Sequence, residues 1–527
     1  MNAEFRAAGR QVWDRVFVLC AIAVCGLLIW MSLTRGHDWG GDFAGYIMQT
    51  RSLVDGPEHM DKLRYVIENS VKRPGPVAYP WGTSLLLAVP YTMFGTDLLT
   101  LKSVNLVCYL LFLACLWVFI RERHRGVLRY CFLLLFALNP TMIGSANRVM
   151  SDMPFLAAST AAIMLIANVT TGRVDGSARL RDHLALGILI AVALFLRRNA
   201  VLLLLTLAGC QIVELLLLWA PQWTRRHGGA RDVTTRRPML RAAGRSLIPY
   251  VTCALLVLVL EGAFPADESA HVARLDLIRA AKSSAQFHDF SRLPRAFFGS
   301  LSSPGWRIDR AIHLASLPFL ALGVLVRLRR DYPFAAYSLA VWGLYIIWPG
   351  HIDLRYLFPL LPFYIHFVLI GAGASWRSLE GKTARITRAT ATAVIVLIVI
   401  GFGWVAAKNG VNNLLRARHA PEGPNSPVTQ KMFSAVRAFT RPDDVVAFYK
   451  PRILLFYTGR RSVRLVHPSQ LGRADYVVLR RAGATFVEAF QGESETLMEN
   501  GALVVVYESW KYQICRVALT EHVGERD

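Results

Sequence analysis

The segment YPWGTSLLLAVPYTMFG, residues 79–95, is apolar enough to enter a membrane, and it determines the sidedness of the whole chain. One more crossing here would place every later segment on the opposite side of the bilayer. The segment is short, contains Pro90 and ends at Gly95, features that suit an interfacial or re-entrant helix. We therefore predict that residues 79–95 do not span the membrane.

The distribution of Lys and Arg supports this prediction. If residues 79–95 do not span, the dense basic clusters share one side with the basic N-terminal segment MNAEFRAAGRQVWDR, residues 1–15. The clusters are RERHRGVLR (121–129), TTGRVDGSARLRDH (170–183), PQWTRRHGGARDVTTRRPMLRAAGR (221–245), RLRRD (327–331) and SWRSLEGKTARITR (375–388). The positive-inside rule assigns such clusters to the cytoplasm, so the N-terminus is predicted to be cytoplasmic.

The composition is that of an integral membrane protein. Of 527 residues, 54% are hydrophobic and only 18% are charged, and the mean hydropathy is +0.37. Several apolar runs approach the roughly 20 residues that cross about 30 Å of hydrocarbon, and a barrel would show short alternating segments instead. We predict an α-helical polytopic fold of about eleven transmembrane helices, near residues 14–33, 99–120, 130–146, 154–170, 184–197, 200–219, 247–264, 310–327, 334–349, 356–375 and 390–408.

The chain is predicted to have two domains. Residues 1–408 form the transmembrane domain with two long external loops, 34–98 and 265–309, the second with an amphipathic helix around residues 267–282. No small-residue cleavage site follows the first apolar run, so we interpret that run as a retained anchor. Residues 409–527 show helical and strand-like runs, which predict a small extracytoplasmic α/β domain.

The formal net charge of +23 does not predict a nucleic-acid partner. The arginines lie in short clusters between apolar runs, where topology and contact with anionic membrane lipids account for them. Seven of the eight cysteines lie in or beside apolar runs. No disulfide framework or CxxC zinc site is therefore expected in the C-terminal region.

The first external loop carries two acids close to the membrane. In RGHDWGGDFAGYIMQTRSLVDG, residues 35–56, Asp38 and Asp42 precede an amphipathic stretch predicted to lie flat on the surface. Its apolar stripe is Phe43, Tyr46, Ile47, Leu53 and Val54. Asp42 falls in the first helical turn, where it either caps the helix or acts as a general base.

A second acid is expected on the same side. Asp152 lies in NRVMSDMPFL, residues 147–156, four residues after Arg148 and just before the fourth predicted span. Helix capping by Ser151 or Asp152 is the structural alternative. A charge so close to a span is costly, which favours a functional role.

Further arginines are predicted to reach the outer side. Arg197 and Arg198 lie in a tight external turn, and Arg355 lies in PGHIDLRYLFPLLPF, residues 349–363, with His351 and Asp353. Snorkelling to lipid headgroups is the alternative explanation for each arginine. Acids beside arginines at a membrane surface suggest a pocket in which a carboxylate activates a nucleophile and guanidinium groups bind a phosphate.

The order of these elements resembles the GT-C membrane glycosyltransferases. The segments that carry the resemblance are GDFAGYIMQTRSLVDG (41–56), LLLAVPYTMFG (85–95), NRVMSDMPFL (147–156), LFLRRNAVLLL (194–204) and RYLFPLLPF (355–363). The branch that they resemble most contains the bacterial relatives of protein O-mannosyltransferases and the aminoarabinose transferase that modifies lipid A.

The resemblance implies specific roles. Asp42 takes the place of the family's first-loop carboxylate, which is catalytic or faces the acceptor, and the donor is implied to be a sugar on a polyprenyl phosphate. Many members have Asp-Glu where this chain has Asp42-Phe43. A second acidic contact, by Asp38 or Asp152, and a divalent cation therefore stay open. The candidate phosphate ligands are Arg148, Arg197, Arg198 and Arg355, and the candidate lining residues are Asp38, Tyr46, His351 and Asp353.

We interpret the chain as an inverting glycosyltransferase at the outer face of a bacterial cytoplasmic membrane. The acceptor is a lipid, a glycan or a protein, and no cofactor is assigned. The alternatives are a lipid-linked glycan polymerase or ligase, a transporter or flippase, and a scaffold or sensor. A transporter is disfavoured because no internal repeat is evident and the charges gather at one face instead of the membrane midplane.

The topology yields a direct prediction. A reporter that is active only in the cytoplasm, fused after Asp527, is expected to give no signal, because the C-terminal domain is predicted to be external. The same reporter inserted in the predicted cytoplasmic segment 221–245 is the positive control. A strong signal from the fusion after Asp527 would reverse the sidedness of every candidate site residue.

Overall fold

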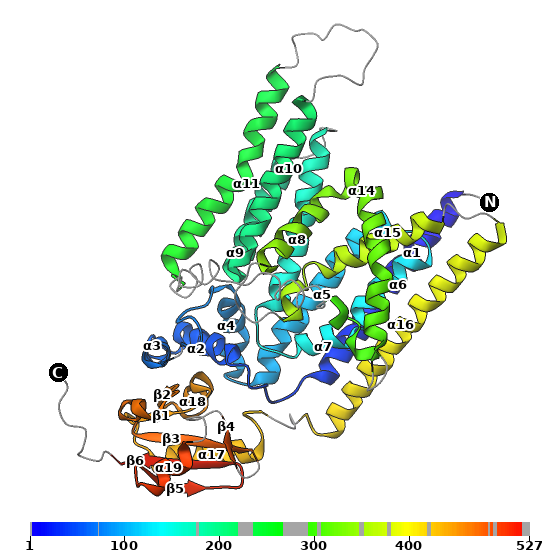
Figure 1. The fold of residues 1–527 in the computed structure, drawn as a ribbon. Coiled ribbons are helices and arrows are strands. Elements are labelled where there is room, and N and C mark those ends of the chain that lie inside the picture. Colours follow the sequence, from blue (N-terminus) through cyan, green and yellow to red (C-terminus); the bar gives the residue numbers. More distant parts are fainter. Residues whose placement is uncertain are drawn as a thin grey trace.

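A computed structural model of the chain describes residues 3–71, 73–174, 179–219, 236–266, 294–302, 307–346, 353–376, 381–418, 423–482, 485–487 and 493–518. His351 and the predicted amphipathic helix at 267–282 lie outside these residues. A bundle of long helices makes up most of the molecule, and a small sheet domain covers one end of it (Figure 1). We call that end of the bundle the domain end.

The predicted polytopic helical fold is confirmed. Within the described residues, seven helices are long and apolar enough to cross a membrane, or eight if the bent pair α6 and α7 is one span. The bundle consists of α1 (Ala3–Ser32), α5 (Leu98–Arg123), α6 (Val127–Ala137), α7 (Pro140–Ala146), α8 (Asp152–Val174), α9 (Leu180–Leu196), α10 (Val201–Trp219), α11 (Arg236–Ala263), α14 (Ile308–Ile346), α15 (Leu361–Ser375) and α16 (Gly381–Leu415).

Each of the eleven predicted spans coincides with helix in this bundle. Helix α14 contains two of them, because its backbone leaves helical geometry at Asp331, with φ −113° and ψ 20°. Helices α9 and α15, with 17 and 15 residues, are shorter than the length that a span usually needs. The α14 hairpin packs tightly on α15, since a Cβ on Gly323 would lie 1.8 Å from the Phe367 carbonyl oxygen.

A buried charge cluster fixes the bend of α14 at the end opposite to the C-terminal domain. The Asp331 side chain, 1% exposed, lies 3.2 Å from Arg123, 3.3 Å from Arg327 and 3.2 Å from His366. A buried carboxylate needs such partners to stay charged. These contacts tie the bend to α5 and α15.

Helix α4 (Gly82–Phe94) does not reach across a membrane. Its 13 residues, with Pro90 inside the helix, rise about 20 Å at 1.5 Å per residue, against about 30 Å of hydrocarbon. It packs against α2 (Asp42–Val54), α5 and α9, and it lies with α2 and α3 (Glu58–Asn69) at the domain end (Figure 1). The three short helices form a platform between the bundle and the C-terminal domain.

Helix α2 is not the half-exposed surface helix that its stripe predicts. All residues from Phe43 to Thr50 are buried, including those off the apolar stripe, while Val54 is 39% exposed. The C-terminal domain covers the side that was expected to face water. Phe43 and Ile47 share one hydrophobic cluster with Ile453 and Phe456 of that domain.

The C-terminal domain has the predicted α/β fold. Its sheet has the strand order β2-β1-β3-β6-β5, with β4 paired to β3, and β1 is parallel to β2 and β3 whereas the other pairs are antiparallel. The elements are α17 (Pro427–Phe439), β1 (Val445–Ala447), α18 (Pro451–Thr458), β2 (Arg461–Val463), β3 (Tyr476–Ala482), β4 (Thr485–Val487), α19 (Ser494–Glu499), β5 (Leu503–Glu508) and β6 (Tyr512–Val517).

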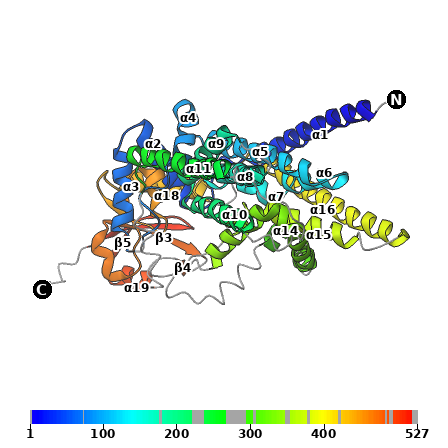
Figure 2. The same ribbon diagram turned by 90° about the horizontal axis from the view of Figure 1, so that it is seen from above.

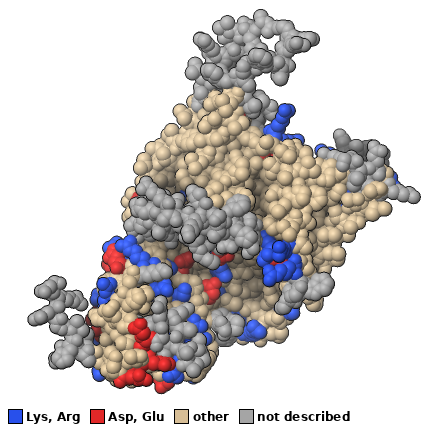
Figure 3. Space-filling view, in the orientation of Figure 1, with Lys and Arg blue, Asp and Glu red and all other residues tan. Residues whose placement is uncertain are grey.

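Helix α18 attaches this domain to the platform. It contacts α2 and α3, and the three helices lie near one another in both ribbon views (Figures 1 and 2). Backbone contacts next to β2 add to this attachment, because the Arg464 N–H donates to Ser70 Oγ at 2.9 Å and the Val71 N–H donates to the Arg464 carbonyl at 3.0 Å. Charged side chains gather around this junction, while the flank of the bundle is largely uncharged (Figure 3).

Candidate active site

Asp42 lies at the junction of the platform, the bundle and the C-terminal domain. The helix N-cap is Gly41, no side chain caps the helix, and the Asp42 carboxylate is bound by other segments instead. Its Oδ1 accepts hydrogen bonds from the Tyr79 hydroxyl at 2.7 Å and from Arg452 Nη2 at 2.9 Å. Its Oδ2 faces Arg355, with Nη2 at 3.8 Å. Asp42 therefore does not serve as the helix cap.

Arg452 comes from the second residue of α18, in the C-terminal domain. Its guanidinium donates to the Tyr79 hydroxyl at 2.5 Å, to Asp42, and to the Pro74 carbonyl at 2.7 Å. The residue is only 5% exposed. The pKa of Arg452 is raised, because the attraction of Tyr79 and Asp42 outweighs the effect of burial. The two domains thus share one charge cluster.

The pKa of Asp42 lies below its usual range. Burial alone would raise it, but Arg452, the Tyr79 hydrogen bond and Arg355 together outweigh burial. The pKa of Tyr79 is well above its usual value, mainly through burial. At neutral pH the site therefore contains an ionised carboxylate and a neutral phenol.

Arg355 is incompletely paired. It lies in a 3₁₀ turn, η4 (Leu354–Leu357), which precedes α15. Its ion pairs are long, at 3.8 Å to Asp42 and 3.6 Å to Asp353, and its Nε is buried without a hydrogen-bond partner among the described residues. A buried guanidinium donor without a partner is costly, which suggests that a ligand satisfies it.

Asp152 and Arg197 form a tighter pair behind this cluster. Arg197 Nη2 lies 2.8 Å from Asp152 Oδ1, and Asp152 is 5% exposed. Arg197 Nε also donates to Ser151 Oγ at 3.0 Å, and the Tyr46 hydroxyl donates to the same oxygen at 3.0 Å. Burial raises the pKa of Tyr46 to about 12. The ion pair joins the start of α8 to the turn after α9, and the hydrogen bond from Tyr46 joins α2 to the same place.

Asp38 and Arg148 form a separate, more exposed pair. Arg148 Nη2 lies 3.3 Å from Asp38 Oδ2, and His37 Nδ1 lies 2.8 Å from Asp38 Oδ1. The pKa of Asp38 is lowered because His37 and Arg148 outweigh the effect of burial. Arg198, by contrast, makes a two-pronged contact with Glu261 of α11 at 2.6 and 2.7 Å, which balances its charge.

A buried lysine fixes the start of the loop 34–98. Lys102 of α5 is fully buried, and its ammonium donates to Thr34 Oγ1 at 2.9 Å, to the Gly36 carbonyl at 2.5 Å and to Asn147 Oδ1 at 2.9 Å. These bonds hold the start of the loop against the segment that leads to Asp152. Lys102 therefore contacts both the segment that precedes Asp42 and the segment that precedes Asp152.

Sequence reasoning brought Asp42, Asp152, Arg197 and Arg355 to one site, but it missed Tyr79, Lys102 and Arg452. Tyr79 lies in the segment that was analysed only for topology. For Arg452, the available signal was the glycine pattern of WGGDFAG, residues 39–45, because closely spaced glycines often allow another group to approach the backbone.

The residues around Asp42 do not fit a divalent cation. Within the described residues, no group of three or more His, Cys, Asp or Glu is placed to hold a metal ion. The charged groups next to Asp42 are the guanidinium groups of Arg452 and Arg355, which repel a cation.

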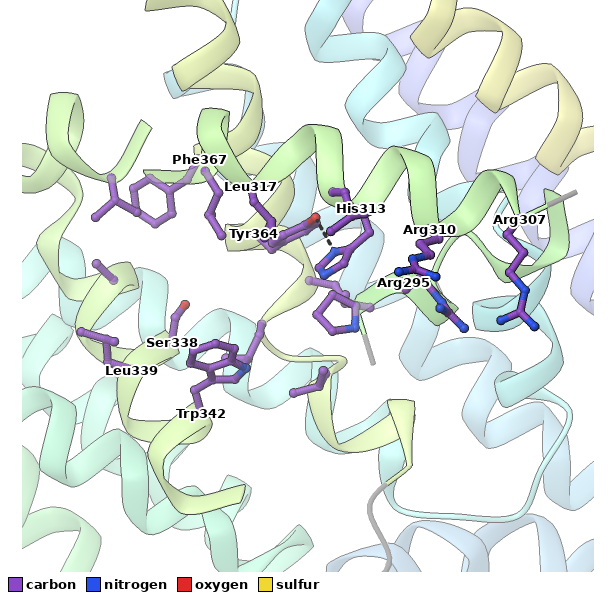
Figure 4. A pocket seen from close by; sticks show the side chains of 18 residues that line it. Arg295, Arg307, Arg310, His313, Leu317, Ser338, Leu339, Trp342, Tyr364 and Phe367 are labelled. Carbon is purple, nitrogen blue, oxygen red and sulfur yellow. Dashed lines mark hydrogen bonds between the residues drawn. The ribbon is translucent and has the colours of Figure 1, made fainter. Parts of the chain in front are cut away.

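A cavity of about 700 Å³ lies between the arms of α14 and α15 (Figure 4). Its walls are mainly apolar, and Arg295, Arg307 and Arg310 lie together at one end. The wall includes Leu357 and Leu360, which follow Arg355 closely in the chain. Such a cavity suits a ligand with a long apolar chain and an anionic head.

The helical bundle, the platform of short helices and the small C-terminal sheet together form a fold that this chain shares with the GT-C membrane glycosyltransferases. Among solved structures, the chain is similar to ArnT from Cupriavidus metallidurans bound to undecaprenyl phosphate, with a TM-score of 0.55, 13% identity, and coverage of 96% of this chain and 98% of that one. ArnT in the apo state gives a TM-score of 0.53 at 12% identity and the same coverage.

The archaeal oligosaccharyltransferase AglB from Archaeoglobus fulgidus, in complex with an inhibitory peptide and a dolichol-phosphate, is similar as well. Its TM-score is 0.50 at 10% identity, and the match covers 89% of this chain and 69% of AglB. No protein-family model and no curated protein sequence matches the chain. At these identities the similarity establishes the fold.

Proposed function

We propose that the chain is a glycosyltransferase that moves a sugar from a polyprenyl-phosphate donor to an acceptor at the outer face of a bacterial cytoplasmic membrane. The main support is the juxtaposition of the ionised Asp42 with Arg355, whose buried Nε has no hydrogen-bond partner among the described residues and only a long ion pair, 3.6 Å, to Asp353. A carboxylate beside a phosphate-binding guanidinium is what attack on a sugar phosphate requires. Among proteins that share the fold, the structure of ArnT has bound undecaprenyl phosphate and that of AglB is a complex with a dolichol-phosphate.

The reaction follows from this geometry. An acceptor hydroxyl or amine, oriented by Asp42 Oδ2, attacks the anomeric carbon, and its proton passes to that carboxylate. The bond between the anomeric carbon and the phosphate oxygen breaks on the opposite face, so the configuration inverts. The leaving polyprenyl phosphate gains negative charge, which Arg355 stabilises.

Arg355 is the preferred phosphate ligand among the candidate arginines because its ion pairs are the weakest. Its contacts of 3.6 and 3.8 Å contrast with 2.8 Å for Arg197 and 2.6 Å for Arg198. An incoming phosphate can replace long contacts at little cost, whereas a tight buried pair resists separation. Arg197 and Asp152 then form the rigid support behind the site.

The cavity between α14 and α15 is the proposed site of the donor's lipid chain. Its apolar walls match a polyprenyl chain, and Leu357 of its wall lies two residues after Arg355, the preferred phosphate ligand. Figure 4 shows Leu317 and Phe367 on the apolar side and Arg307 and Arg310 on the basic side. A lipid-linked donor enters such a site from within the bilayer.

The first test uses purified protein in lipid nanodiscs with a panel of hexosyl and pentosyl undecaprenyl phosphates. Envelope lipid and envelope protein serve as acceptors, and release of free undecaprenyl phosphate is measured by mass spectrometry. We expect Asp42→Asn to reduce transfer roughly 10²-fold or more, because it removes the charge at nearly constant size.

Asp97→Asn is the matched control for Asp42→Asn. Asp97 caps α5 by accepting from the Thr100 N–H at 3.0 Å, and Asn caps a helix about as well as Asp. Transfer by the control should stay at the parent level. Parent-like transfer by the Asp42→Asn protein would remove Asp42 from the mechanism.

The second prediction concerns Arg355. Arg355→Lys keeps the charge but loses the planar fork that binds phosphate through two donors, so the transfer rate should fall roughly tenfold or more. Arg329→Lys, at an exposed position near the opposite end of the bundle, is the control. If Arg355→Lys and Arg329→Lys both transfer sugar at the parent rate, Arg355 is a lipid anchor and not a phosphate ligand.

The third prediction tests the cavity. Leu317→Trp places a large ring where the lipid chain is proposed to lie, so the KM for the undecaprenyl-phosphate donor should rise severalfold. Leu325→Trp is the control, because Leu325 lies on the same helix, is 73% exposed and does not line the cavity. An unchanged donor KM in the Leu317→Trp protein would place the lipid chain elsewhere.

A further inference from the structure

One buried arginine side chain of the C-terminal domain, Arg452, lies in the candidate active site. Arg452 is separated from Asp42 by 410 residues and belongs to a different domain, yet its guanidinium lies 2.9 Å from the carboxylate. Its other two acceptors, Tyr79 and Pro74, also belong to the first external loop. All three hydrogen-bond acceptors of this side chain therefore lie across the domain interface.

The surroundings of Arg452 are shaped for its guanidinium. A Cβ on Gly75 would lie 2.8 Å from Nη1, one on Gly41 would lie 3.2 Å from Nη2, and one on Gly45 would lie 3.4 Å from Nη1. Three glycines from two segments thus leave the space that the guanidinium fills. An interface that needed only a cation at this position would not require such close backbone approach.

The two carboxylate oxygens of Asp42 have different partners. Oδ1 accepts hydrogen bonds from Tyr79 and Arg452, whereas Oδ2 faces Arg355 Nη2 at the longer distance of 3.8 Å. The Asp42 side chain is 34% exposed, so one oxygen stays accessible. Arg452 and Tyr79 fix the plane of the carboxylate and present Oδ2 on the side of Arg355.

We propose that Arg452 is a positioning residue of the active site and that docking of the C-terminal domain completes the catalytic centre. This inference rests on the proposed glycosyl transfer, because it assigns Asp42 the role described above. Arg452 acts through Asp42 and does not contact the substrates. The C-terminal domain is then an obligatory part of the enzyme.

The proposal predicts a specific pattern of kinetics. A lysine at position 452 has one ammonium in place of two donating nitrogens, so it cannot hold Tyr79, Asp42 and Pro74 in the same geometry. The kcat of Arg452→Lys should fall about tenfold or more, while the acceptor KM should change by less than about threefold. The matched control is Arg460→Lys, because Arg460 donates only to Thr440 and to the Arg437 carbonyl within the C-terminal domain.

The pH profile provides a readout that a purely structural role would not change. Arg452 helps to keep the pKa of Asp42 low, so its removal in Arg452→Gln should raise that pKa. Activity that needs ionised Asp42 should then decline at a higher pH on the acid side than in the parent. Arg460→Gln should leave the acid limb unchanged.

The deciding experiment is a double-mutant cycle on the full-length protein in nanodiscs, with undecaprenyl-phosphate sugar as donor. If Arg452 acts through Asp42, Arg452→Lys should cause little further loss when added to Asp42→Asn. Gly41→Ala, which crowds Nη2 while leaving every charge in place, should lower kcat as well and serves if the Arg452 variants do not fold.

Three results would overturn the proposal: parent-like kcat in Arg452→Lys and Gly41→Ala, equal losses in Arg452→Lys and Arg460→Lys, or additive losses in the cycle. Each of these requires a parent protein that transfers sugar. A parent that transfers no sugar from any undecaprenyl-phosphate donor contradicts the proposed function itself, so the two failures are distinguishable.

Discussion

The candidate site depends on keeping one largely enclosed carboxylate ionised. Asp42 lies among apolar helices, where burial favours the neutral acid, and its charge is maintained by donors from three separate segments. Tyr79 comes from the first external loop, Arg355 from the turn before α15, and Arg452 from the C-terminal domain. Any arrangement that separates these segments leaves the carboxylate without compensation. The relative placement of loop, bundle and sheet domain is therefore tied to the electrostatics of one side chain.

Two of the acid–arginine pairs of the site, Asp152–Arg197 and Asp42–Arg355, differ in burial and in distance. Asp152 is 5% exposed and lies 2.8 Å from Arg197, whereas the Asp42 side chain is 34% exposed and lies 3.8 Å from Arg355. Separating a tight buried pair leaves two uncompensated charges, at a cost of about 3–5 kcal/mol. A loose, partly exposed pair exchanges its partner more easily. The inner pair suits a fixed support, and the outer pair suits contact with a charged substrate.

Local patterns were sufficient to predict most of the fold. Each of the eleven predicted spans overlaps helix, and seven or eight of the described helices are long and apolar enough to cross a membrane. The short segment with Pro90 and Gly95 forms the 13-residue helix α4. The β-branched and aromatic runs located β1, β3, β5 and β6 of the C-terminal domain but not the short strands β2 and β4. The exposure of α2 was predicted wrongly, because its amphipathic stripe reports the face that meets the bundle and carries no information on a domain that covers the other face.

Chain order and membrane sidedness were sufficient to predict which residues share a surface, but not which of them contact residues of the C-terminal domain. Positions at the ends of predicted spans brought Asp42, Asp152, Arg197 and Arg355 to one surface. The partner of Asp42 at position 452 was not predictable, because a single arginine in a soluble domain with many arginines has no distinguishing local pattern. Its role depends on docking between domains, which is a property of tertiary packing. His351 and residues 267–293 of the loop 265–309 lie outside the described residues, so the predictions for them stay predictions.

The short helices bear on how the proposed reaction would combine polar chemistry with a lipid-linked donor. The two ends of a transmembrane helix lie on opposite sides of the bilayer. If all catalytic groups were on such helices, only the residues at the helix ends could take part in polar chemistry at the membrane surface. Helices α2, α3 and α4, of 13, 12 and 13 residues, instead remain at one end of the bundle and add a layer on which Asp42 lies. The apolar cavity is lined by α14, by α15 and by Leu357 of the turn that carries Arg355. In the proposed reaction, a donor with its chain in that cavity would place its phosphate near Arg355, whose guanidinium is held beside Asp42 before the reaction begins, as stabilisation of a developing charge requires.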